Sequence, residues 1–144
     1  ITTFNFDGVT YHRFHMAAGW GDYNGNGVPD LYVADGGGFG NQLFENASAD
    51  TTRFIRVRVR GSGPDIDNGS NLDGIGAQVK LFDAAGILQG FQQVLSGPGA
   101  PELFFGIPEA GAEYDVEVYF PRTKTTIVRR NIPGGSIVEV EEVE

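Results

Sequence analysis

The sequence predicts an all-β protein, and three features of the chain support this fold class. Apolar and polar residues alternate with a period of two in several stretches, whereas the residue spacing typical of helices is almost absent. Glycine accounts for 22 of the 144 residues without a collagen-like repeat, which indicates many tight turns. Several prolines lie between the alternating stretches, where strands end.

The alternation is clearest in the C-terminal part of the chain, residues 53–144. In RFIRVRVRG, isoleucine and valine occupy one face of the expected strand and arginines occupy the other. EYDVEVYFP and SIVEVEEVE alternate in the same way, and further strands are expected at GAQVKLFD, LQGFQQVL, ELFFGI and TTIVRRNI. These runs predict an antiparallel β-sandwich of seven or eight strands.

The arginine stripe on the first of these strands, formed by Arg56, Arg58 and Arg60, has two interpretations. It is either a charged, solvated face or an anion-binding site. The acidic stripes of other predicted strands, such as Glu139 and Glu141, offer partners across neighbouring strands. We therefore favour cross-strand ion pairs, each of which contributes little to stability.

Residues 1–50 differ in composition and are expected to form a separate β unit. They are rich in aromatic residues and glycine, and they hold six acidic residues against Arg13 alone. Strands are expected near residues 10–15, 31–34 and 42–45, and NASADTT marks the boundary by composition. The predicted domains are therefore residues 1–50 and 53–144.

Oxygen-bearing side chains recur at alternate positions of GDYNGNGVPDLYV, residues 21–33. Hard cations such as Ca²⁺ take about six to eight oxygen ligands. Positions 1, 3, 5 and 9 of this loop are Asp22, Asn24, Asn26 and Asp30, and Val28 is expected to add its backbone carbonyl. The loop is not an EF-hand, because an apolar strand residue stands where the final glutamate belongs. We predict a strand–loop–strand site with Ca²⁺ as cofactor, against the alternative of a hairpin turn without metal.

Three weaker signals accompany this loop. DIDNGSNLDGIG is a candidate second cation site with the ligands Asp65, Asp67, Asn71 and Asp73, although a turn rich in Asx residues is the favoured interpretation. Asn46 and Asn68 lie in acceptor sequons for N-glycosylation. Trp20, beside the calcium loop, is expected in the core rather than on a ligand platform.

Composition disfavours several function classes. A formal charge of −9 and a pI near 4.5 repel nucleic acid and anionic membranes. The sequence has no cysteine, no apolar stretch long enough for a membrane span, and no serine elbow or phosphate loop, so we expect no enzymatic activity. The chain starts at Ile1 without methionine, which fits either a trimmed chain or a mature chain whose leader has been removed.

Two stretches of the chain resemble known families. WGDYNGNGVPDLYVADG and the closing NQLFEN resemble a VCBS or FG-GAP repeat, the calcium-loop unit of integrin-type β-propellers, although that family usually has aspartates where this chain has Asn24 and Asn26. Residues 53–144 resemble the ASPIC/UnbV domain of cartilage acidic protein and its bacterial relatives through RFIRVRVRG, SNLDGIGAQVKL, LFFGI, DVEVYFP and NIPGGSIVEVEE.

These resemblances imply an architecture and a location. The architecture is a transthyretin-like or immunoglobulin-like β-sandwich preceded by a propeller-blade-like, calcium-binding β-hairpin unit. The location is extracellular or on the cell surface. No enzymatic activity is implied.

Three functions follow as expectations. The preferred one is a non-catalytic extracellular calcium-binding interaction or adhesion module, with a protein or glycan partner at a cell surface or in the matrix. The first alternative is a structural subunit of an extracellular filament that self-associates through strand edges, by addition of its N-terminal strands. The second alternative is a carbohydrate-binding domain. We expect neither a nucleic acid partner nor a membrane span.

Overall fold

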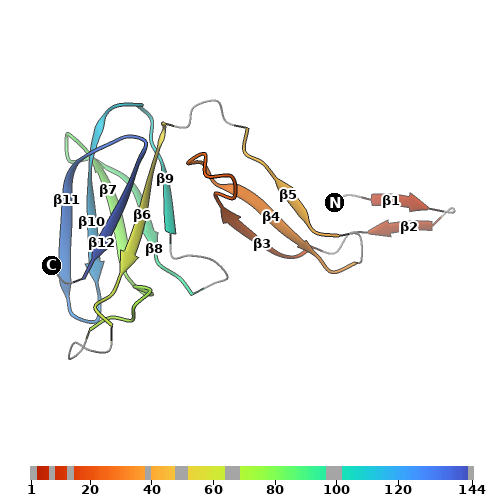
Figure 1. Ribbon diagram of the computed structural model, residues 1–144, viewed down its shortest axis with the longest axis horizontal. Coiled ribbons are helices and arrows are strands. Elements are labelled where there is room, and N and C mark those ends of the chain that lie inside the picture. The colour runs from red at the N-terminus through yellow and green to blue at the C-terminus, as the bar shows by residue number, and fades with distance from the viewer. Residues whose placement is uncertain are drawn as a thin grey trace. The chain divides into compact units, whose positions relative to one another are not determined.

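The computed structural model describes residues 3–6, 9–12, 15–37, 40–47, 52–63, 69–96 and 102–142, and residues 3–6 and 9–12 by their backbone alone. These residues form strands and loops, and among them no helix is long and apolar enough to span a membrane. The all-β prediction is therefore confirmed for the described residues (Figure 1). The chain divides into two compact units, Ile1–Ala49 and Asp50–Glu144.

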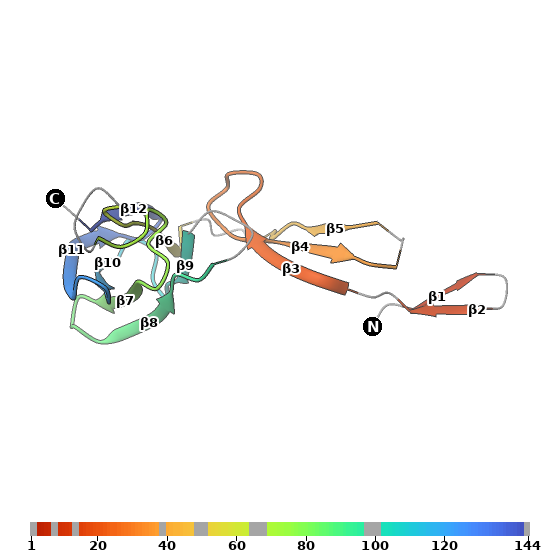
Figure 2. The ribbon, with the colours of Figure 1, turned by 90° about the horizontal axis from the view of Figure 1, so that it is seen from below.

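The N-terminal unit contains a hairpin and a three-stranded sheet. The hairpin pairs β1 (Thr3–Phe6) with β2 (Val9–His12), and the sheet has the order β3-β4-β5. The strands of the sheet, β3 (His15–Gly21), β4 (Asp30–Asp35) and β5 (Gln42–Phe44), are all antiparallel (Figure 2). Instead of one strand over residues 10–15, the structure has β2 and β3. The sequence HMAAGWG of β3 contains no β-branched residue, so it gave no strand signal.

The three-stranded sheet carries apolar side chains on both faces. Trp20, Leu31 and Phe44 are aligned across the strands and share one face, and the next row places Tyr32 and Leu43 on the other. Trp20 is 69% exposed, so the expectation that it belongs to the core is wrong. Among the described apolar residues of this unit, the buried ones are Val28 and Val33.

The C-terminal unit is sandwich-like and consists of two sheets around one core. The four-stranded sheet has the order β11-β10-β7-β8 and the three-stranded sheet has the order β12-β6-β9. The strands are β6 (Phe54–Arg60), β7 (Gln78–Asp83), β8 (Leu88–Gln93), β9 (Glu102–Gly106), β10 (Glu113–Phe120), β11 (Thr125–Pro133) and β12 (Ser136–Glu141). The apolar faces of the alternating strands meet between the sheets. The most deeply buried side chains are Ile55, Val57, Val59, Val79, Leu81, Val94, Val116, Val118, Phe120 and Val140.

One pairing of this unit departs from the antiparallel prediction. β12 runs parallel to β6, with Val138 opposite Val57 and Val140 opposite Val59. β11 and β12 are joined by a short turn, but β11 pairs with β10 in one sheet while β12 pairs with β6 in the other. The chain therefore crosses between the sheets at this turn. The crossing brings the last strand beside the first strand of the unit in the same direction.

Candidate functional site

The predicted calcium loop connects β3 to β4, and Figure 2 shows it at the end of the sheet where these strands meet. Gly25 and Gly27 have φ values of 74° and 93°, a region that favours glycine and allows the chain to curl inward. Asp22 stabilises this curl through both carboxylate oxygens. Its Oδ1 accepts the N–H of Asn26 at 3.0 Å, and its Oδ2 accepts the N–H of Gly27 at 3.0 Å.

The two asparagines at positions 3 and 5 of the loop each accept a hydrogen bond from the backbone N–H two residues further along the chain. Asn24 Oδ1 accepts the N–H of Asn26 at 3.1 Å, and Asn26 Oδ1 accepts the N–H of Val28 at 3.0 Å. The side chain of Val28 is buried. These contacts are those of Asx turns, so they order the loop from within.

Asp30 closes the loop from its far end. This side chain is 1% exposed, and its two oxygens accept backbone N–H groups from different segments. Oδ2 accepts the N–H of Tyr23 at 3.1 Å, and Oδ1 accepts the N–H of Asn46 at 2.7 Å. Asp30 therefore joins the loop to the chain that follows β5.

The chemistry of this donor set fits a hard cation. Asp22, Asn24, Asn26 and Asp30 offer carboxylate and amide oxygens, the ligand class that Ca²⁺ prefers, and these oxygens also accept backbone N–H groups of the loop. In the part of the chain that the structure describes, no group of three or more His, Cys, Asp or Glu residues is placed to hold a metal. The predicted calcium site therefore depends on its two asparagines as well as on Asp22 and Asp30.

The residues after β5 contribute to the loop, a role that sequence reasoning missed. Asn24 Nδ2 donates to Glu45 Oε1 at 3.1 Å, and Asn46 Nδ2 donates to the carbonyl of Pro29 at 3.2 Å. Asn46 is also a predicted glycosylation site, and the nitrogen that would carry the glycan is the one that contacts Pro29. The signal that was present is the closing NQLFEN of the repeat-like stretch. The second sequon residue, Asn68, lies outside the described residues.

The candidate second cation site is only partly described, because Asp65 and Asp67 lie outside the described residues. Asn71 Oδ1 accepts the N–H of Ile75 at 2.9 Å, while its Nδ2 donates to the carbonyl of Ile75 at 3.1 Å. The Asn71 side chain therefore closes a turn. Asp73 is exposed and lines a hollow on the outer face of β6.

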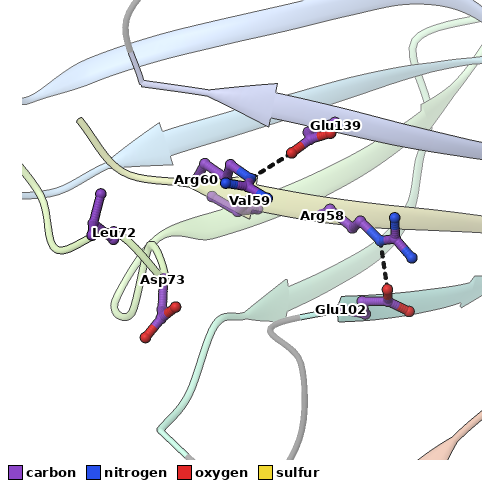
Figure 3. Close-up of a pocket in the computed structure, with 7 residues that line it drawn as sticks. All are labelled: Arg58, Val59, Arg60, Leu72, Asp73, Glu102 and Glu139. Atoms are coloured by element: carbon purple, nitrogen blue, oxygen red, sulfur yellow. Dashed lines mark hydrogen bonds and ion pairs between the residues drawn. The ribbon is translucent and has the colours of Figure 1, made fainter. Parts of the chain in front are cut away.

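The arginine stripe forms cross-strand ion pairs, as predicted. Arg56 and Arg58 both contact Glu102 on β9, at 3.2 Å and 2.5 Å. On the other side Arg60 Nε lies 2.6 Å from Glu139 Oε1 on β12. Arg58 and Arg60 face a hollow of about 480 Å³ together with both glutamates, Leu72 and Asp73 (Figure 3). Each of the three guanidinium groups thus already contacts a carboxylate, with Glu102 shared by two of them, which disfavours an anion site here.

Glu142 forms the densest polar cluster that the structure describes, and sequence reasoning did not single it out. The side chain is only 6% exposed. Its Oε2 accepts the N–H groups of Ser62 and Ser70 at 2.9 and 2.8 Å and the Ser62 hydroxyl at 2.5 Å. Its Oε1 accepts the hydroxyls of Ser70 and Thr123 at 2.7 and 2.8 Å. Burial raises the pKa of Glu142, but the hydrogen bonds from Ser62 and Ser70 outweigh it and lower the pKa to about 2.

This cluster connects three segments to the residue that follows β12. Ser62 and Ser70 lie on opposite sides of the connection between β6 and β7, where Gly61 N–H donates to the Leu72 carbonyl at 3.1 Å. The approach is so close that a Cβ on Gly61 would lie 1.9 Å from the Asn71 carbonyl oxygen. Thr123 belongs to the turn between β10 and β11. The cluster is therefore a structural clamp, with every carboxylate oxygen occupied by donors.

The fold and these clusters define an all-β protein in which a sandwich-like unit follows a loop-bearing β-sheet. A family model described as ASPIC and UnbV matches residues 67–144, more than half of the chain, and the chain belongs to this family. The match begins after β6, so it does not include the loop of residues 22–30. In comparisons with curated proteins and with solved structures, nothing matched.

Proposed function

We propose that this chain is a non-catalytic, calcium-binding interaction or adhesion module. The observation that carries the proposal is the loop of residues 22–30, which gathers carboxylate and amide oxygens around glycines with positive φ. Calcium would bind Asp22, Asn24, Asn26 and Asp30, with the Val28 carbonyl as a further ligand. It would neutralise the two carboxylates and stabilise only the folded loop, which couples stability to calcium concentration.

We also propose that the three-stranded sheet is a propeller-blade-like unit of the VCBS or FG-GAP type. Its two apolar faces support this, because a blade packs against a neighbour on each side. The calcium loop lies between its first two strands. For the C-terminal unit we propose a transthyretin-like or immunoglobulin-like sandwich, supported by two sheets around one core.

The proposed location is extracellular or on the cell surface. A loop with two carboxylates and two amides carries less charge than a high-affinity site, and sites of modest affinity suit a calcium-rich medium. The proposed partner is a protein or glycan of that environment. The polar clusters of the described residues support a non-catalytic role, because their carboxylates are engaged with backbone N–H groups, hydroxyls and arginines.

Calcium is expected to raise the melting temperature of the N-terminal unit. At a calcium concentration of about 100 times the Kd, linkage adds about 2.7 kcal/mol to the folded form, which corresponds to a shift of at least about 5 °C. Trp20 is the sole tryptophan of the chain and lies on β3, so its fluorescence reports on this unit. Melts in calcium, in magnesium and in chelator test the proposal. Coincident melts in calcium and chelator would contradict it.

A second candidate function is a filament subunit that assembles by strand addition. The observation in its favour is that β1 and β2 form a two-stranded hairpin, an arrangement that is marginally stable by itself, while β3 and β5 are the outer strands of a short sheet. The N-terminal strands of one copy would extend a sheet of the next.

Light scattering separates the two candidates. A filament subunit is expected to form large assemblies in calcium that disappear when residues 1–12, which contain β1 and β2, are deleted. An interaction module is expected to keep the same mass in calcium and chelator, with or without those residues. Assemblies that persist after the deletion would contradict strand addition by the N-terminal segment.

A further inference from the structure

The contact between Asn24 and Glu45 fixes the orientation of an amide at the calcium loop. Asn24 Nδ2 donates to Glu45 Oε1 at 3.1 Å, and Asn24 Oδ1 accepts the N–H of Asn26 at 3.1 Å. An ionised carboxylate only accepts hydrogen bonds and a backbone N–H only donates them. The reverse orientation would place the amide nitrogen against the N–H and the amide oxygen against the carboxylate. Both contacts therefore select the same orientation, with the oxygen turned toward the loop.

The strand register explains why Glu45 is available for this role. Phe44, the last residue of β5, pairs with Leu31 of β4, so the chain leaves β5 beside Asp30 at the start of β4. The next residue, Asn46, donates its N–H to Asp30 Oδ1 at 2.7 Å. Two consecutive residues thus contact positions 3 and 9 of the loop.

We propose, resting on the proposed calcium function, that Glu45 is a positioning residue of the calcium site. It is not a ligand itself. It holds the Asn24 amide so that an oxygen rather than an NH₂ group is presented at position 3, and it thereby sets the calcium affinity. Metal ligands are commonly oriented in this way by hydrogen-bond partners behind them, and loss of such a partner weakens binding.

The same contact explains why position 3 is asparagine in this chain. An aspartate there would add a charge for calcium, but it would also place a second carboxylate against Glu45 with no proton between them. Like charges at contact distance repel, and the repulsion would offset the gain. Asparagine is the residue that both supplies an oxygen to the loop and donates to Glu45.

A double-mutant cycle tests the proposal by calorimetric titration of the full chain with CaCl₂. Glu45→Gln is expected to weaken calcium binding about 10-fold, because the glutamine amide either accepts or donates and leaves the Asn26 N–H as the contact that selects the Asn24 orientation. Asn24→Asp in the parent chain is expected to tighten calcium binding less than Asn26→Asp does, because Glu45 opposes the added charge at position 24. The double variant with Asn24→Asp and Glu45→Gln is expected to bind calcium at least about 5-fold more tightly than the sum of the two single free-energy changes predicts.

The matched control is Asn26→Asp. Asn26 is also a predicted ligand, and its Oδ1 contacts Val28 N–H rather than Glu45. The calcium affinity of the double variant with Asn26→Asp and Glu45→Gln is expected to lie within about 2-fold of the value that the two single variants predict if their effects add. Glu45 is exposed, so its substitution is not expected to unfold the unit, and the Trp20 fluorescence of each variant in chelator checks this.

The outcomes distinguish this inference from the proposed function. If the parent chain takes up no calcium, the proposed function fails and the role of Glu45 fails with it. If the parent binds calcium but Glu45→Gln binds equally well, or both cycles show the same coupling, the calcium proposal stands and the role of Glu45 is overturned. Coupling confined to the cycle of residues 24 and 45 supports the inference.

Discussion

Replacing Glu142 with alanine is expected to lower the free energy of unfolding of the C-terminal unit by about 3 kcal/mol or more. The reason is the number of donors that this side chain satisfies. Two backbone N–H groups and three hydroxyls donate to its oxygens, and both Glu142 and Ser70 are 6% exposed. Without the carboxylate, buried donors lose their acceptor, and the connection between β6 and β7 loses its attachment to the end of β12.

The pH dependence of stability provides a second readout of the same residue. The folded pKa of Glu142, about 2, lies below the ordinary value of 4.5. A depressed pKa means that the stabilisation is fully present above pH 4.5 and is lost as the pH falls through about 2. The difference between the two pKa values corresponds to about 3 kcal/mol. Glu142→Ala is therefore expected to remove this part of the pH dependence.

Urea unfolding of the parent and the variant between pH 7 and pH 2.5 measures both effects. The other carboxylates titrate in the same range, so the informative quantity is the difference in unfolding free energy between the two proteins, which should shrink as the pH falls. Glu141→Ala is the matched control, because Glu141 is the preceding residue and is exposed. If Glu142→Ala and Glu141→Ala have the same free energy of unfolding at pH 7, the hydrogen bonds of Glu142 do not stabilise the C-terminal unit.

The sequence signal that could have revealed Glu142 is its phase within the strand pattern. Val138 and Val140 are buried, and alternation places Glu142 on the same inward side, one repeat further along. The run of glutamates in EVEEVE instead indicates a solvated acidic stripe when it is read without this phase. A charged residue in phase with a buried stripe predicts a satisfied polar cluster. The donors, Ser62, Ser70 and Thr123, come from distant segments and have no local signal.

The arginine stripe was predictable because its partners follow from alternation. Once β6 and β12 are strands of one sheet, Arg60 and Glu139 both face outward, and Arg60 contacts Glu139 across the pair. Whether β12 runs parallel or antiparallel to β6 was not predictable, because the alternation of apolar and polar residues is the same in both cases. It depends on the crossing between sheets after β11, which no period-two pattern encodes.

In the loop of residues 22–30, too, local contacts were predictable from the sequence and long-range contacts were not. Spacing within residues 22–30 predicted Asp22, Asn24, Asn26 and Asp30 as ligands, and in the structure each of these side chains accepts a backbone N–H of the loop. The contacts from Glu45 and Asn46 depend on the register of β5 against β4, which spacing does not give. The exposure of Trp20 was missed for a related reason, because local patterns do not tell which face of a sheet is covered.

Replacing Asp30 with alanine is expected to destabilise the N-terminal unit and to abolish its response to calcium. The N–H groups of Tyr23 and Asn46 lose their acceptor at a site where the side chain is 1% exposed. Unsatisfied buried donors cost about 1–3 kcal/mol each, so we expect a loss of about 3 kcal/mol in chelator. The loop would also lose one of its two carboxylates, and the proposed calcium ligand at position 9 with it.

Asp30→Asn separates the two roles of this side chain. The amide keeps one oxygen as an acceptor but carries no charge, so it should recover part of the stability in chelator while most of the calcium response stays lost. Asp35→Ala, at the other end of β4, removes the same charge away from the loop and should retain the calcium shift. Thermal melts followed by Trp20 fluorescence in calcium and in chelator measure all four proteins. A calcium shift in Asp30→Ala equal to that of the parent would place the cation elsewhere, whereas unchanged stability in chelator would show that Asp30 does not hold the loop.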